Sequence, residues 1–214
     1  MFDLDALADR LIGIPNVVAV VLGGSRATGT DGPDADWDLG LYYDATLDPA
    51  HVRDLGYDGQ VFAPGEWSPL MDGGAWLDVE GTKVDLIYRE ISAVRHWIAE
   101  ADAGRFKVEL LGGYLAGFDT TVLVGEVALS RPLRGTLPFR VDRYPDALRR
   151  SAPLHWRSRR DFSLLYADMH ARRGDDVMEQ AMRARAAIEE AHARLAERGE
   201  WVLNEKGLLA RARG

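Results

Sequence analysis

The feature that most constrains the fold is a run of apolar residues that stops at a pair of glycines. Val17–Leu22 holds six consecutive apolar residues and ends at Gly23-Gly24-Ser25. A run of this length, bounded by glycine, is typical of a buried strand followed by a tight turn. After a turn-rich loop at residues 30–35, a second strand is expected over Asp36–Tyr43. The chain therefore begins as a sheet-forming region, with a short helix expected between these two strands.

The second expected strand carries two carboxylates on one face. Side chains alternate between the faces of a strand, so Asp36 and Asp38 share one side while Trp37 and Leu39 point to the other. Neighbouring carboxylates repel each other, and a hard cation that needs both of them is the usual reason to keep them together. Gly40 continues the carboxylate face, where we expect it to leave room for a ligand above the strand.

A third carboxylate is expected on another strand. Residues 75–79 and 83–88 predict a hairpin that turns through Glu80-Gly81. In its second strand, Asp85 points away from the apolar side chains on either side of it. A lone aspartate in a strand is more often the partner of a nearby cation such as Lys83. Asp85 is therefore a candidate metal ligand only in combination with Asp36 and Asp38.

The glycine-serine turn supplies the complementary chemistry for a phosphate. Gly24 permits close approach of the backbone, and the Ser25 hydroxyl can donate a hydrogen bond to a phosphate oxygen. No Gly-Lys-Ser/Thr follows, so the turn is not a P-loop. A turn of this kind followed by three aspartates is suited to holding a nucleoside triphosphate through magnesium.

The first aspartates also have a calcium alternative. Asp34, Asp36 and Asp38 imitate the start of an EF-hand loop. Leu39, however, stands where that loop requires glycine, and Ala45 stands where it requires glutamate. We therefore expect Asp34 to be an ordinary loop residue.

Residues 16–90 resemble the nucleotidyltransferase superfamily, which includes DNA polymerase beta and the aminoglycoside and lincosamide nucleotidyltransferases. The shared pattern is an apolar strand, Gly-Ser, an Asp-x-Asp pair and a later strand with a third acid. The resemblance implies an α/β (α+β) fold, with a small mixed, mostly antiparallel sheet followed by a helical C-terminal region. It also implies two Mg²⁺ ions. The implied catalytic and metal-binding residues are Asp36, Asp38 and Asp85, and the implied nucleotide-binding residues are Gly24, Ser25 and Arg26.

The implied reaction transfers a nucleoside monophosphate, AMP as first choice, from a triphosphate to a hydroxyl of a small acceptor, with pyrophosphate leaving. By the same resemblance the acceptor would be an aminoglycoside or lincosamide antibiotic. Asp85 or a separate residue such as Glu109 would take the hydroxyl proton. Two alternatives stay open: an antitoxin-type adenylyltransferase that modifies a toxin partner, and a non-catalytic module that only binds nucleotide.

Composition divides the chain in two. Residues 1–100 hold 18 acidic and 6 basic residues, whereas residues 101–214 hold 16 and 20. The pattern turns helical near Tyr144, so we expect a catalytic domain over residues 1–140 and a helical domain over 141–214. The chain has no cysteine, no apolar run approaching about 18 residues and an acidic N-terminus, which together favour a cytoplasmic protein without membrane spans. Homo-oligomerisation stays open.

The helical region carries three further patterns. Phe162, Leu165 and Met169 form an apolar stripe that is expected to pack against a neighbour. Asp176 with Glu179 predicts a capping box at the start of the next helix. That helix then repeats apolar residues on one face, which is also expected to be packed: Val177, Ala181, Ala184, Ile188, Ala191 and Leu195. The eight arginines between residues 143 and 173 are expected to cover solvated helix faces and not to bind nucleic acid.

Overall fold

The computed structural model describes residues 2–30, 32 and 35–214, so Asp34 and part of its loop lie outside the described residues. The chain divides into two compact units. The first unit comprises residues 1–96 and 126–140, and the second comprises residues 97–125 and 141–214. The domain boundary expected at residue 140 stays a prediction, and the compact second unit also takes in residues 97–125.

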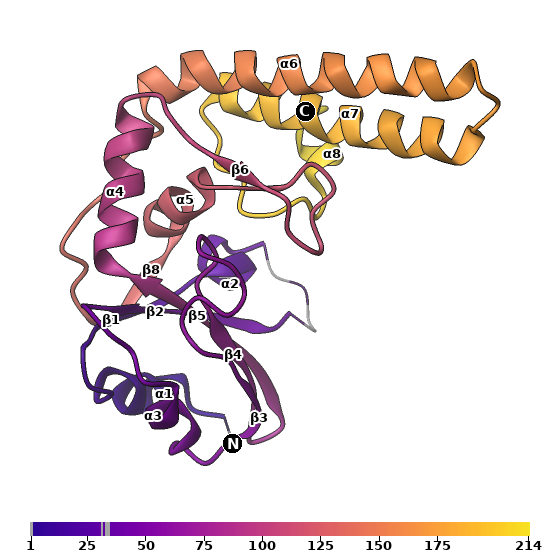
Figure 1. Ribbon diagram of the computed structural model, residues 1–214. Coiled ribbons are helices and arrows are strands. Elements are labelled where there is room, and N and C mark those ends of the chain that lie inside the picture. Colours follow the sequence, from indigo (N-terminus) through magenta and orange to yellow (C-terminus); the bar gives the residue numbers. More distant parts are fainter. Residues whose placement is uncertain (1, 31, 33–34) are drawn as a thin grey trace. The chain divides into compact units, whose positions relative to one another are not determined.

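The first unit is built on one twisted sheet (Figure 1). Within the described residues it has six strands in the order β3-β4-β5-β2-β1-β8. All neighbouring strands are antiparallel except β2 and β5, which are parallel. The strands are β1 (Val17–Leu22), β2 (Trp37–Tyr43), β3 (Asp58–Val61), β4 (Gly74–Val79), β5 (Thr82–Glu90) and β8 (Arg131–Gly135).

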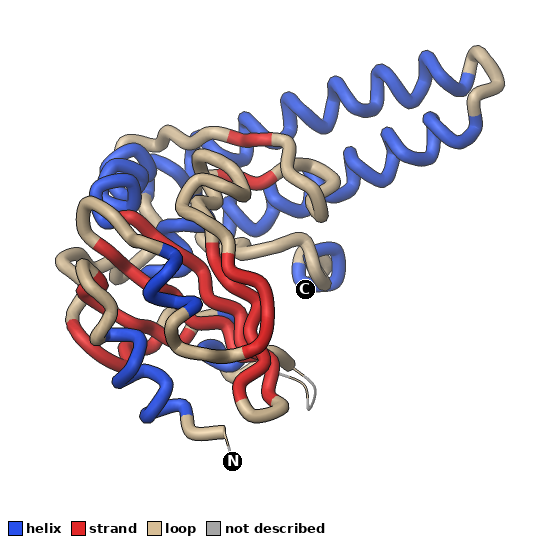
Figure 2. Tube along the Cα trace, turned by 60° about the horizontal axis from the view of Figure 1, so that its bottom comes forward, coloured by secondary structure: helices blue, strands red, loops and turns tan. Residues whose placement is uncertain are grey.

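Alternation along these strands gives the sheet a core face and a second face. Leu39, Leu41, Val84 and Leu86 point to the core face, where each is fully buried. Two helices pack on this side through the same apolar cluster: α1 (Leu4–Ile12) and α3 (Pro49–Arg53). The α1 helix begins at the Asp3 cap, whose carboxylate accepts a hydrogen bond from the Ala6 amide at 3.0 Å. Figure 2 shows the strands of this sheet side by side.

Two of the three crossings of the chain between the units lie inside helices. Helix α4 (Ile91–Asp102) begins in the first unit and ends in the second, and α5 (Thr121–Leu129) does the reverse. The remaining short helix of the first unit, α2 (Gly24–Thr28), follows β1 directly. No helix in the described part of the chain is both long enough and apolar enough to cross a membrane.

The second unit is dominated by a helical hairpin. Helices α6 (Asp146–Ala171) and α7 (Asp176–Arg198) lie side by side along their length, as Figures 1 and 2 both show. The short helix α8 (Leu208–Arg211) packs on α7 through Leu195, Val202 and Leu208. A two-stranded ribbon completes the unit and consists of β6 (Val108–Glu109) and β7 (Phe118–Asp119).

Two expectations about this hairpin are wrong, and a third holds only in part. The stripe on α6 is largely exposed, since 61% of Phe162 and 62% of Leu165 is accessible, and the buried face is formed by Leu148, Ala152, Trp156, Ser163 and Ala167. The α7 stripe is buried only toward its C-terminal end, because 78% of Val177 is exposed. The N-cap of α7 is Asp175 and not Asp176: its carboxylate accepts a hydrogen bond from the Met178 amide.

The expected fold class is confirmed. The chain is 44% helical and 20% strand, with a mostly antiparallel sheet followed by a helical C-terminal region. The expected strand Val17–Leu22 and the hairpin around Glu80-Gly81 are also present.

Candidate functional site

The strand register brings two of the three predicted aspartates together. In the parallel pair β2–β5, Asp38 lies directly opposite Asp85. Both side chains project from the second face of the sheet, because their sequence neighbours Leu39, Val84 and Leu86 are buried on the core face. Neighbouring strands are about 5 Å apart, so the two carboxylates are held side by side by backbone hydrogen bonds. Each is partly exposed.

Asp36 is placed differently from the other two. It precedes β2 by one residue and is exposed. A spacing of two residues along a strand is about 7 Å, which separates Asp36 from the Asp38–Asp85 pair. Within the described residues, no group of three His, Asp or Glu side chains lies close enough together to hold a metal ion. The structure therefore places the carboxylates of Asp38 and Asp85 side by side, and the third carboxylate, Asp36, lies two residues before Asp38.

The turn after β1 is built around Asp38. The Gly23 amide donates a hydrogen bond to the Asp38 carbonyl at 2.8 Å, which extends the β1–β2 ladder into the turn. Gly24 has φ = 60°, a left-handed conformation that glycine adopts without strain. A Cβ atom on Gly24 would lie 1.8 Å from Oδ2 of Asp38, so no larger residue fits at this position without displacing the carboxylate. Ser25 follows in the first turn of α2.

Arg26 turns toward the loop before β2. Its guanidinium donates hydrogen bonds to the carbonyls of Ala35 (2.6 Å) and Asp36 (3.3 Å). The same group lies 4.3 Å from the centre of the Trp37 ring. These contacts fix the end of the loop that leads into the aspartates, and the predicted contact of Arg26 with nucleotide stays a prediction.

An aromatic surface lies on the other side of Asp85. In the antiparallel pair β4–β5, Trp76 is directly opposite Asp85 and shares its face, with 49% of its surface exposed. Trp67 stacks on Trp76 with ring centres 5.8 Å apart, and Phe62 meets the same indole edge-on at 4.9 Å. Gln60 of β3 is the next neighbour in this row. The row across the second face therefore runs from Gly24 through Asp38 and Asp85 to Trp76.

The space beside Gly40 is not available to a ligand, which corrects the sequence expectation. A Cβ atom there would lie 2.9 Å from Cγ2 of Val21 and 3.0 Å from the Tyr42 ring. Glycine at this position accommodates those two side chains and leaves no open space. On the same face, Asp38 and Asp85 are partly exposed.

A buried ion pair closes the far end of the same face. The Arg89 guanidinium, fully buried, bonds to both carboxylate oxygens of Glu126 at 2.6 and 2.8 Å and to the carbonyl of Met71 at 2.7 Å. Burial opposes the charge, yet the carboxylate of Glu126 holds the pKa of Arg89 above its ordinary value. The pair ties α5 to the sheet inside the first unit.

The donor set at Asp38 and Asp85 fits magnesium. Carboxylate oxygens are hard ligands, and Mg²⁺ is typically held by one or two of them together with water and substrate phosphates. Gly24 leaves the backbone free to come close to the Asp38 carboxylate, where a side chain would block it. The metal-binding and catalytic roles of Asp36, Asp38 and Asp85 stay predictions. The strand register places Asp38 opposite Asp85, and Asp36 lies apart from them.

The comparisons with known proteins add no family to this description. No protein-family model matches the chain, and no curated protein is significantly similar to it.

Glu109 lies in the second unit, on β6, where its backbone pairs with Phe118. Its role as a general base stays a prediction. The same unit contains a buried pair that the sequence did not reveal. Nδ1 of His192 lies 3.8 Å from Oδ2 of Asp119, and the imidazole stacks on Trp156 with ring centres 4.2 Å apart. The two residues are 73 positions apart on different elements, so no spacing rule could have joined them.

Burial disfavours the charged form of both residues in the Asp119–His192 contact. Burial raises the pKa of the Asp119 carboxyl to about 6, although Thr121 donates hydrogen bonds to it. Burial also lowers the pKa of His192 to about 4. Between these two pKa values both side chains therefore favour their neutral forms.

Proposed function

We propose that this chain is a magnesium-dependent nucleotidyltransferase. It transfers a nucleoside monophosphate, AMP as first choice, from a triphosphate to a hydroxyl of a small acceptor and releases pyrophosphate. The observation that carries the proposal is the register that sets Asp38 against Asp85, with Gly24 pressed against Asp38. A nucleotide-binding turn and two adjacent carboxylates are the minimum equipment for this reaction.

Each residue of the row has a distinct task in this proposal. Asp38 and Asp85 would hold magnesium, and Asp36, two residues before Asp38, remains the third predicted ligand; when bound, the metal neutralises phosphate charge and lowers the pKa of the acceptor hydroxyl. Ser25 donates a hydrogen bond to a phosphate oxygen, and the backbone at Gly24 approaches the same phosphate. Asp85 accepts the proton of the attacking hydroxyl.

The order of residues across the face supports a direction of attack. In-line displacement places the attacking oxygen opposite the leaving group. With the leaving pyrophosphate toward Gly24 and Ser25, the acceptor hydroxyl approaches from the side of Asp85 that carries Trp76. The exposed indole is then the surface on which a ring of the acceptor can stack.

Pyrophosphate release tests the proposal. The purified chain is incubated with each labelled triphosphate, Mg²⁺ and a panel of acceptors that includes aminoglycosides, lincosamides and a tyrosine peptide. Asp38→Asn and Asp85→Asn should each lower turnover at least a hundredfold, because each removes a charged ligand. Asp58→Asn, an exposed aspartate on β3, is the matched control and should retain wild-type turnover.

The same set of proteins separates the proposal from its alternatives. Label transferred to the tyrosine peptide and to no small acceptor would favour the antitoxin-type reaction. Tight magnesium-dependent triphosphate binding with no transfer to any acceptor would indicate a nucleotide-binding module. Equal turnover of wild-type and Asp38→Asn protein would overturn the assignment of the site.

A further inference from the structure

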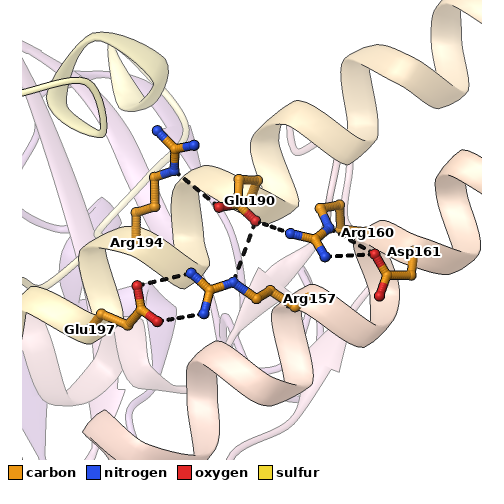
Figure 3. Close-up of polar contacts among 6 residues, drawn as sticks. All are labelled: Arg157, Arg160, Asp161, Glu190, Arg194 and Glu197. Atoms are coloured by element: carbon orange, nitrogen blue, oxygen red, sulfur yellow. Dashed lines mark hydrogen bonds and ion pairs between the residues drawn. The ribbon is translucent and has the colours of Figure 1, made fainter.

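The helical hairpin of the second unit has two sides that differ in charge balance. On one side, a network of arginines and carboxylates links the two helices (Figure 3). Glu190 accepts from Arg160 at 2.5 Å and Arg194 at 3.0 Å, and Arg157 bonds to both oxygens of Glu197. Arg160 also pairs with Asp161 at 2.7 Å. Within this network three guanidiniums face three carboxylates, so its charges balance.

The other side of the hairpin contains a groove whose charges do not balance. Glu189, the residue before Glu190, is fully buried there and pairs with two guanidiniums: Nε of Arg185 at 3.1 Å and Nε of Arg159 at 3.5 Å. The same carboxylate also accepts a hydrogen bond from Ser163 at 2.7 Å. Among the described residues the groove thus has two cations for one anion.

The single carboxylate of Glu189 does not satisfy the hydrogen bonding of both arginines, and Arg159 is the one left short. Its Nε–H is buried and, among the described residues, makes no hydrogen bond, because the 3.5 Å contact with Glu189 is an ion pair without hydrogen-bond geometry. One terminal nitrogen of the same guanidinium bonds to the carbonyl of Ala116 at 3.0 Å, which fixes the group in place. Burial and the neighbouring Arg185 both lower the pKa of Arg159. A second anion in the groove would relieve this arrangement.

The walls of the groove are apolar and exposed. Phe162 and Tyr166 of α6 lie with ring centres 5.0 Å apart, at 61% and 41% exposure, and Met182 of α7 also lines the groove. The groove has a volume of about 480 Å³, within the range of small-molecule sites. It therefore combines a fixed positive charge at its base with a flat aromatic wall.

We propose that this groove binds a small organic anion, one carboxylate, sulfonate or phosphate group of which pairs with Arg159 and Arg185 while an apolar or aromatic body packs on Phe162 and Tyr166. A second copy of the chain is a poorer occupant, because a two-fold contact sets identical patches against each other and would bring four guanidiniums together. The inference concerns the second unit alone and stands independently of the nucleotidyltransferase proposal.

The probe for the test is 8-anilinonaphthalene-1-sulfonate, an aromatic sulfonate whose fluorescence rises in apolar sites, titrated into the full chain. Its uncharged analogue N-phenyl-1-naphthylamine measures apolar binding alone. We expect one saturable sulfonate site in the wild type, with affinity at least tenfold above that of the neutral analogue and decreasing with salt. Arg185→Gln should lower sulfonate affinity about tenfold and leave the neutral analogue unchanged.

Two variants complete the design. Phe162→Ala removes an exposed wall and should weaken both probes. Arg194→Gln, on the same helix but on the balanced side, is the matched control and should change neither probe. Arg185→Gln leaves Glu189 paired with Arg159, one charge against one, so the helix pair keeps its fold, which circular dichroism verifies.

The proposal is overturned by any of three results. These are no saturable sulfonate binding, equal binding of the charged and neutral probes, or an Arg185→Gln variant with wild-type sulfonate affinity. Sedimentation that shows a wild-type dimer dissociated by Phe162→Asp would also overturn it, since the groove would then be a self-association surface.

Discussion

At the scale of single residues, Gly24 couples backbone conformation to the position of a carboxylate. Its left-handed φ of 60° and the 1.8 Å approach of a hypothetical Cβ to Asp38 are separate constraints. Gly29, at φ = 70°, has the first constraint without the second, because no atom lies within 4 Å of its Cβ position. The two glycines therefore separate backbone strain from displacement of the site.

We expect Gly24→Ala to destabilise the protein by about 2–3 kcal/mol and to abolish magnesium-dependent triphosphate binding. Gly29→Ala should cost only about 1 kcal/mol of backbone strain and leave binding intact. Urea unfolding measures the first quantity and calorimetry with and without EDTA the second. Equal effects of the two substitutions would show that Asp38 is not held by Gly24.

Trp76 tests the direction of attack. Because its indole is on the surface and not in the core, Trp76→Ala should leave the fold and the affinity for magnesium-triphosphate unchanged. It should raise the KM for the acceptor about five- to tenfold, the value of a lost stacking contact of about 1–1.5 kcal/mol. Trp76→Phe should recover part of that loss. A weaker triphosphate affinity with an unchanged acceptor KM would place the nucleobase, and not the acceptor, on the indole.

At the scale of elements, local pattern predicted those units whose interactions are local. The strand Val17–Leu22 and the β4–β5 hairpin follow from apolar runs and a Glu80-Gly81 turn, and both are present. The length of helix α6 is harder to predict from the sequence, because Pro153 lies inside it and a proline usually ends a helix. Packing of Leu148, Ala152 and Trp156 on either side of the proline stabilises the helix through it.

The candidate site was predictable in its residues but not in its geometry. Alternation along one strand placed Asp36 and Asp38 on the same side, which the sequence can show. The placement of Asp38 opposite Asp85 depends on the parallel register of β2 and β5, which are about 45 residues apart and have no local signal for pairing. The crowding at Gly40 likewise depends on Val21 of the neighbouring strand.

The contact between β7 and α7 predicts an unusual response to pH. Asp119 has a folded pKa of about 6 against 3.8, so its contribution to stability is complete below pH 4 and lost by pH 6. His192 has a folded pKa of about 4 against 6.5, so its contribution is complete above pH 6.5 and lost toward pH 4. The two contributions to stability change in opposite directions with pH, so they offset each other between pH 4 and 6.

Single substitutions should reveal the pH dependence that each residue contributes when the free energy of unfolding is measured in urea at pH 4.5, 5.5 and 6.5. Asp119→Asn keeps the hydrogen bonds from Thr121 and should become less stable as the pH falls. His192→Phe keeps the stacking on Trp156 and should become less stable as the pH rises. Each change should be on the order of 2–3 kcal/mol across the range. Parallel pH profiles of the wild type and both variants would contradict the opposed pKa shifts.

At the scale of the whole molecule, each compact unit is assembled from two separate stretches of chain. The first unit takes residues 126–140 from beyond the segment that belongs to the second unit. That late segment supplies β8, which pairs with β1, and Glu126, which neutralises the buried Arg89. Neither unit can therefore be obtained by cutting the chain once.

We expect a fragment of residues 1–96 to lack a cooperative unfolding transition. It would leave Arg89 as an uncompensated buried charge, at a cost of about 3–5 kcal/mol, and would expose the edge of β1. Thermal unfolding followed by circular dichroism checks this against the full chain. A sharp transition in the fragment would mean that β8 and Glu126 are dispensable.

The late arrival of β8 also matters while the protein is being made. On the ribosome, the valine-rich edge of β1 emerges roughly 110 residues before the strand that covers it. At about 5–20 residues per second, this edge waits for about 6–20 seconds without its final neighbour. During that interval the nascent chain presents an aggregation-prone strand, so its yield in cells depends on translation speed and on chaperones that shield such edges.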